Sequence, residues 1–60
     1  MSTTQLFKLV QRARTDIYRR GKDQAGVQRM LENHIYLTGY AKLERQRIAS
    51  EILSKAIETI

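Results

Sequence analysis

Apolar side chains recur every three or four residues along the chain, and this spacing restricts its fold more than any other feature. A spacing near 3.6 is the period of one face of an α-helix, whereas a half-buried strand alternates with a period of two. No segment of useful length alternates in that way, and the chain has no proline to interrupt a helix. The sequence therefore predicts an all-α fold.

The chain has 60 residues and no cysteine, so we expect one small domain without disulfide bonds or cysteine-bound zinc. A chain of this size buries little surface, and it needs well-packed helices or a second copy for stability. We expect a compact three-helix bundle that forms a homodimer through its C-terminal helix.

Glycines divide the chain into three predicted helices. Gly21 and Gly39 follow the first and second of them, at positions where glycine commonly ends a helix. The turns at both glycines are short and are compatible with a helical hairpin or with crossed helices, so the packing order stays open. The predicted helices span about residues 3–20, 24–38 and 40–59.

Two helix starts carry capping residues. Ser2 and Gln5 have the spacing of a capping box, so either Ser2 or Thr3 can cap the first helix. Asp23 is the predicted N-cap of the second helix, because its carboxylate can accept a hydrogen bond from a free backbone N–H.

The third predicted helix is apolar over about half of its circumference, which is wider than one helix–helix contact requires. The other two helices of the chain can cover this face completely. We expect instead that part of it contacts the same helix of a second chain, because a two-fold interface enlarges a small core. The residues assigned to this interface are Ile52, Leu53, Ala56, Ile57 and Ile60.

The positive charge of the chain lies in its first half. The net charge is +5, and residues 1–30 hold seven basic and two acidic side chains, whereas residues 31–60 hold four of each. On a helical wheel, Lys8, Arg12 and Arg19 form a stripe roughly 40° wide. Such a stripe can contact phosphates or an acidic protein surface, although a solvated face without a partner is an alternative.

Arginine and tyrosine are enriched among the residues that dominate protein interfaces, and arginine also makes paired contacts to carboxylates and phosphates. Tyr36 lies on the predicted polar face of the second helix, and Tyr40 follows the glycine at the next turn. A place at the edge of a small core is the alternative for both tyrosines. The residues assigned to binding of a partner or of nucleic acid are Lys8, Arg12, Arg14, Arg19, Arg20, Tyr36 and Tyr40.

His34 is the one histidine, and it falls inside the apolar arc of the second predicted helix. A lone histidine without cysteine cannot anchor an ordinary transition-metal site, and no motif places a nucleophile or a carboxylate beside it. We expect a packed and hydrogen-bonded side chain, with a pH-sensitive interface residue as the alternative. The sequence predicts no catalytic residue, no metal and no cofactor, so we expect a protein that is not an enzyme.

The sequence predicts neither a secretory signal nor a membrane-spanning segment. Lys8 interrupts the apolar residues near the N-terminus, and no long apolar run follows. The lack of cysteine favours the reducing cytoplasm. A basic amphipathic helix that lies on an anionic membrane is an alternative. We expect a cytoplasmic protein that does not bind membranes.

A helix-turn-helix centred on Gly39 matches poorly, because Arg45 falls where the recognition helix should bury an apolar side chain. In its short length, basic charge and lack of cysteine, the chain resembles the accessory proteins of phages and mobile elements. This resemblance implies a small regulator that acts on a host transcription factor or polymerase.

We therefore expect a non-enzymatic protein that binds a DNA-binding transcription regulator and modulates its activity on DNA. The basic first helix would add attraction to phosphates in the joint complex. The alternative is a protein that binds nucleic acid directly through Lys8, Arg12, Arg14, Arg19 and Arg20.

Overall fold

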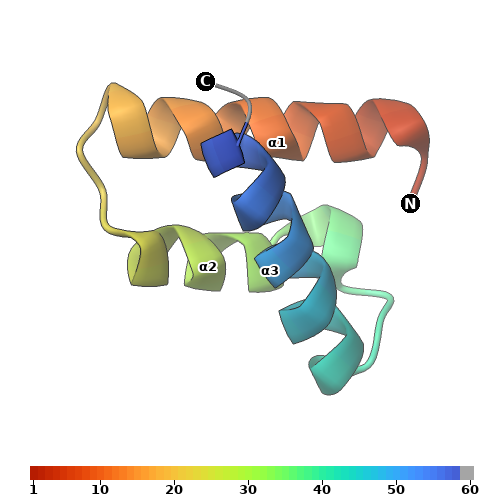
Figure 1. Ribbon diagram of the computed structural model, residues 1–60. Coiled ribbons are helices and arrows are strands. Elements are labelled where there is room, and N and C mark those ends of the chain that lie inside the picture. Colours follow the sequence, from red (N-terminus) through yellow and green to blue (C-terminus); the bar gives the residue numbers. More distant parts are fainter. Residues whose placement is uncertain (59–60) are drawn as a thin grey trace.

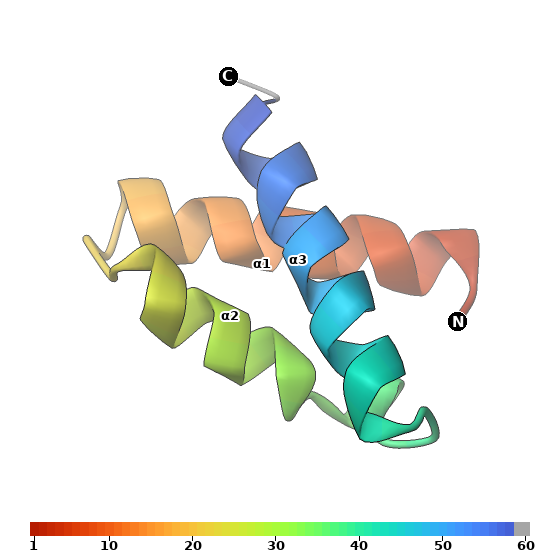
Figure 2. The same cartoon turned by 60° about the horizontal axis from the view of Figure 1, so that its bottom comes forward.

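The computed structural model describes residues 1–58, and every regular element in this part of the chain is a helix, as the spacing of the apolar residues predicts. The elements are α1 (Thr3–Tyr18), α2 (Gln24–Glu32), the short 3-10 helix η1 (Ile35–Leu37) and α3 (Lys42–Glu58). α1 and α2 run in roughly opposite directions, and α3 crosses the pair (Figure 1; Figure 2). The packing is thus a helical hairpin crossed by a third helix.

Both ends of α1 follow from local chemistry. The Ser2 hydroxyl accepts a hydrogen bond from the Gln5 N–H at 3.2 Å, and Gln5 Oε1 accepts one from the Ser2 N–H at 3.1 Å, so Ser2 is the N-cap. The helix ends at Tyr18, two residues before the predicted Arg20. Gly21 then takes a left-handed φ of 66°, which glycine adopts at little cost, and the chain turns toward α2.

α2 is fixed at its start by a cap and along its length by a bridge to α3. The Asp23 carboxylate accepts a hydrogen bond from the Gly26 N–H at 2.7 Å, which confirms Asp23 as the N-cap. One turn later, the Gln28 amide donates to the Gln46 carbonyl oxygen of α3 at 3.1 Å. The first of these contacts fixes the start of α2, and the second joins α2 to the crossing helix.

The prediction of one continuous helix over residues 24–38 is wrong, because α2 ends at Glu32 and a separate turn begins at a histidine. His34 has an extended backbone, and its Nδ1 accepts a hydrogen bond from the Tyr36 N–H at 3.2 Å. A side chain that bonds to nearby backbone in this way competes with continuation of the helix. The result is η1 in place of the last turn and a half of the predicted helix.

This break decides which apolar side chains of the segment are buried. In a continuous helix, Ile35 would follow Leu31 by four residues and share its inner face, while Leu37 would point elsewhere. With the break, Leu37 is fully buried and Ile35 is 75% exposed. The core therefore gains one large side chain from η1 and leaves another in solvent.

α3 crosses the α1–α2 pair (Figure 2), and all three helices and η1 contribute side chains to the core. Three of its members are alanines, which allow the helix backbones to approach closely. The buried apolar side chains are Leu9, Ala13, Val27, Leu31, Leu37, Ala49, Ile52 and Ala56.

The start of α3 differs from the expected one. α3 begins at Lys42, two residues later than predicted, and Ala41 before it is exposed and has no polar side chain with which to cap the helix. Arg45 is partly buried on the face that also carries Ala49, and its Nε has no hydrogen-bond partner. Arg45 is the residue that weakens the match to a helix-turn-helix, and in the structure it is a cation on the inner side of α3.

Candidate functional site

The outer face of α1 carries exposed aromatic and basic side chains together. Leu9 and Ala13 point inward and are buried, so the 3.6-residue period turns Phe7, Arg14 and Tyr18 outward. Phe7 is 61% exposed and Tyr18 is 51% exposed, so both rings present apolar surface to solvent on the same face of α1.

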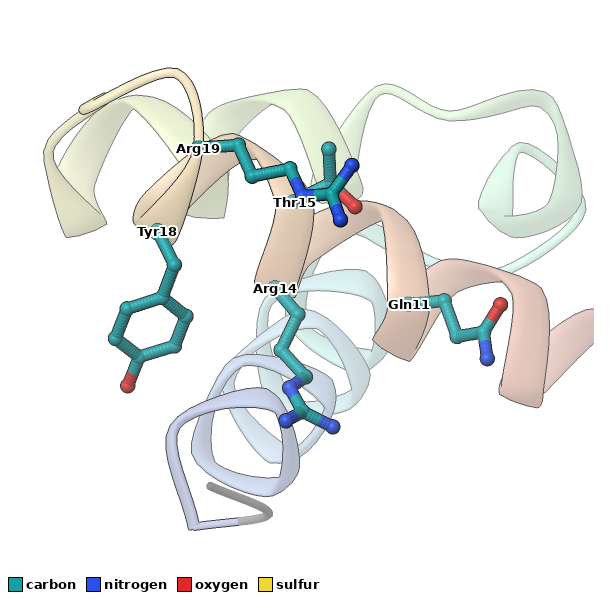
Figure 3. Close-up of a pocket in the computed structure, with 5 residues that line it drawn as sticks. All are labelled: Gln11, Arg14, Thr15, Tyr18 and Arg19. Carbon is teal, nitrogen blue, oxygen red and sulfur yellow. The ribbon is translucent and has the colours of Figure 1, made fainter.

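One pocket on this face lies over the second half of α1 and has a volume of about 370 Å³. Figure 3 shows Arg14 and Arg19 extending along opposite sides of it, with Tyr18 at one end and Gln11 at the other. In this view Thr15 lies beside the guanidinium end of Arg19, and it completes the lining. The lining contains two guanidinium groups and no carboxylate, so it suits an anionic group.

A second pocket lies over the first half of α1 and reaches the last turns of α3, with a volume of about 340 Å³. Its lining includes Leu6, Phe7 and Val10, which make it mainly apolar. Gln11 and Arg14 line both pockets, so the two pockets are neighbours on α1. We call the combined surface the α1 groove, lined by Thr3, Leu6, Phe7, Val10, Gln11, Arg14, Thr15, Tyr18, Arg19 and Lys55.

The predicted basic residues divide into three groups. Arg14 and Arg19 line the α1 groove. Lys8 and Arg12 are exposed beside it on α1, and no ion pair joins either of them to a carboxylate within residues 1–58. Arg20 lies at the end of α1, outside the groove, and is treated separately below.

Arg20 is held by a buried carboxylate. Asp16 is 2% exposed, and its Oδ1 lies 3.7 Å from Arg20 Nε while its Oδ2 lies 4.0 Å from Lys22 Nζ. The Asp16 carbonyl also accepts a hydrogen bond from the Lys22 N–H at 2.9 Å. Arg20 and Lys22 therefore both pair with Asp16 at the turn after α1.

The two predicted tyrosines lie away from the α1 groove and pack at the edge of the core. The Tyr36 ring lies 4.7 Å from the His34 ring, and the Tyr40 hydroxyl accepts a hydrogen bond from the Met1 ammonium at 2.7 Å. Both side chains are partly buried, which is the alternative that the sequence left open for them. Tyr18 is the tyrosine that lines the groove.

His34 is partly buried and hydrogen-bonded, as predicted, although it starts a turn and does not lie within a helix. Burial, and after it the positive charge of Arg12, lower the pKa of His34 from its ordinary value of 6.5. The neutral imidazole is the form that can accept the hydrogen bond from the Tyr36 N–H. Arg12 thus links the basic side of α1 to the α2–η1 turn.

The residues assigned to a dimer interface lie in different places. Ile52 and Ala56 are fully buried inside the single chain, because α3 turns them toward α1 and α2, so they have no surface to offer a second copy. Leu53 and Ile57 are partly buried and keep some surface. Ile60 lies outside the described residues.

Phe7, like Tyr18, is a groove residue that the sequence assignment omits. It lies beside Tyr18 on the helical wheel, at the edge of the apolar arc of α1, and this pairing of two aromatic residues is the signal that points to it. Its exposure depends on where α3 crosses α1, which the sequence does not specify.

Residues 1–58 contain no group of three His, Asp or Glu side chains that could hold a metal ion. None of the helices in the described part of the chain has the length and apolar character needed to cross a membrane. No family model, no curated protein and no solved structure matches this chain.

Proposed function

We propose that this protein is a non-enzymatic regulator that acts by binding another protein, with the α1 groove as its binding surface. The observation that carries this proposal is the combination of exposed aromatic rings with arginines that lack an acidic partner in residues 1–58. Phe7 and Tyr18 are 61% and 51% exposed beside Arg14 and Arg19. Aromatic residues and arginine are enriched at protein interfaces, where they supply most of the binding energy.

The class of partner rests on the length and charge of the chain. Small, basic, cysteine-free proteins of this kind resemble the accessory proteins of phages and mobile elements, and we propose a DNA-binding transcription regulator as the partner. Lys8 and Arg12 lie on α1 beside the groove, so they could contact phosphates while the groove holds the protein.

The test is affinity capture from source-cell lysate that has been treated with nuclease. The wild-type protein is compared with the Arg14→Glu, Arg19→Glu double variant. The matched control is the Arg29→Glu, Lys42→Glu double variant, which makes the same change of charge at exposed positions of α2 and α3. We expect one protein to be captured by the wild type and by the control, and to be lost with the groove variant. Equal capture by all three would contradict the proposal.

Direct binding of nucleic acid is the second candidate, and the stripe of Lys8, Arg12 and Arg19 supports it. None of the three forms an ion pair with an acidic group in the described part of the chain. If the stripe binds duplex DNA, log K should fall with log salt concentration by about 0.9 per phosphate contact. Replacement of Arg12 and Arg19 by glutamine should then weaken binding and flatten that slope. Weak binding that is unchanged in the double variant would exclude this candidate.

We also propose a homodimer through the edge of α3, now limited to Leu53 and Ile57 among the described residues. Their partial exposure supports it, because each has apolar surface left that a second copy could cover. Sedimentation at micromolar concentration separates a mass near 7.0 kDa from twice that value. A monomer at these concentrations would remove the dimer from the proposal.

A further inference from the structure

The α1 groove changes in chemical character along its length. Its first half exposes mainly the apolar surface of Leu6, Phe7 and Val10, next to Arg14 and Lys55. Its second half is lined by Arg14 and Arg19 with polar neighbours. One end therefore favours apolar side chains and the other favours carboxylates. A partner that fills the whole groove must present both kinds of group in that order.

The groove runs along α1, so a partner helix that lies along it can contact both halves. α1 has 16 residues, which corresponds to a length of about 24 Å. Phe7 and Arg14 are seven residues apart, which is about two turns, and Arg19 follows more than one turn later. An amphipathic helix can place apolar residues on one such stretch of its surface and acidic residues one to three turns away.

The electrostatics of the groove select an acidic partner. None of the residues that line it is acidic, and the whole chain carries a net charge of +5. Within residues 1–58, neither Arg14 nor Arg19 forms an ion pair. Their guanidinium groups lie on opposite sides of one pocket, so two carboxylates on successive turns of a helix could each reach one of them (Figure 3).

We infer that the α1 groove binds an amphipathic helix of the partner protein, with apolar side chains over Phe7 and acidic side chains between Arg14 and Arg19. This inference rests on the proposed function, because it names the part of the partner that the groove recognises. Duplex DNA is a poorer occupant, since a phosphate backbone would leave the apolar half of the groove uncovered.

The experiment uses the photoreactive amino acid benzoylphenylalanine in place of Phe7, in the full chain expressed in its source cells. Leu43 is the control position, because it is also large and apolar and is 78% exposed on α3. Crosslinked products are digested, and the attached segment of the partner is identified by mass spectrometry. We expect a crosslink at Phe7 and not at Leu43, to a segment with apolar residues at helical spacing and several Asp or Glu residues.

A synthetic peptide of the crosslinked segment then gives the affinity by isothermal titration calorimetry. Phe7→Ala and Arg14→Glu should each weaken binding by about tenfold or more, because both sites lie in the centre of the contact. Lys42→Glu makes the same charge change outside the groove and should alter the affinity by less than about threefold. Circular dichroism checks that each variant is folded.

The possible results separate this inference from the proposed function. A crosslink from Phe7 to a basic or neutral segment, or to a second copy of this chain, would contradict the inference that the groove binds an acidic helix of the partner. If the crosslinked segment is basic or neutral but belongs to another protein, the proposed function would still stand. The absence of any protein crosslink at Phe7 would overturn both the inference and the proposed function.

Discussion

Both faces of α1 carry large apolar side chains, but the surroundings of these side chains differ. Leu9 on the inner face is 1% exposed, whereas Phe7, two residues earlier, is 61% exposed. Both positions follow from one helical period, but α2 and α3 pack against the inner face, where Leu9 joins the core. The difference shows that folding and binding can be separated on this helix. Inner-face changes should lower stability, and outer-face changes should lower binding.

The largest expected contrast is between Leu9→Ala and Phe7→Ala. Leu9→Ala should lower the free energy of unfolding by about 2–5 kcal/mol, because it removes a fully buried side chain from a small core. Phe7→Ala should change it by less than about 0.5 kcal/mol, since the ring lies mostly in solvent. Chemical denaturation followed by circular dichroism measures both. A loss above 1 kcal/mol for Phe7→Ala would show that the outer face also supports the fold.

The next effect concerns the turn that follows α1. Gly21 has a φ of 66°, and an added Cβ would lie in open space. Gly21→Ala therefore causes no clash, and its cost comes from the left-handed backbone that alanine would have to adopt. We expect a loss of about 1–2 kcal/mol. Gly39→Ala is the matched control, because Gly39 also has open space but no positive φ, and it should cause no loss. Equal losses for both variants would contradict the role assigned to the left-handed turn.

A smaller gain in stability is expected at a site far from both faces of α1. Ala41→Ser places a hydroxyl before α3, three residues ahead of Glu44, and so completes the spacing of a capping box. The free energy of unfolding should rise by about 0.5–1 kcal/mol, with partner binding unchanged. A change in partner binding would indicate that the groove and α3 are coupled.

The smallest effect is a pH dependence at the point where the basic side of α1 meets the α2–η1 turn. The pKa of His34 is lowered in the folded chain, so the unfolded chain binds a proton more readily. The free energy of unfolding should therefore fall as the pH is lowered from about 7 through the folded pKa of His34. Arg12→Gln should reduce this slope, because its charge is the second cause of the lowered pKa. The slope should disappear in His34→Gln, and its persistence there would assign it to another group.

Local features of the fold were predictable from the sequence, because they depend on neighbouring residues. The capping box at Ser2, the N-cap at Asp23 and the glycine turn at Gly21 each involve groups within a few residues of one another. The end of α2 was not predictable in this way. His34 starts η1 in a structure where Leu37 is buried by the other helices, and a helical wheel of the segment contains no information about that packing.

The candidate site could be predicted in part. Arg14 and Arg19 were assigned from charge and residue type, and both line the α1 groove. Arg20 has the same residue type but lies beside the buried Asp16, and no pattern of spacing indicates that this carboxylate is buried. The exposure of Phe7 could not be predicted, because it depends on the angle at which α3 crosses α1.

The most direct test is a substitution scan along α1 in which the midpoint of thermal unfolding and the affinity for the captured partner are both measured for every variant. The separation of the two faces predicts a lower midpoint with Leu9→Ala. It predicts weaker binding at an unchanged midpoint with Phe7→Ala, Arg14→Ala and Arg19→Ala. If these three outer-face variants bind the partner as tightly as the wild type, the α1 groove is not the binding surface.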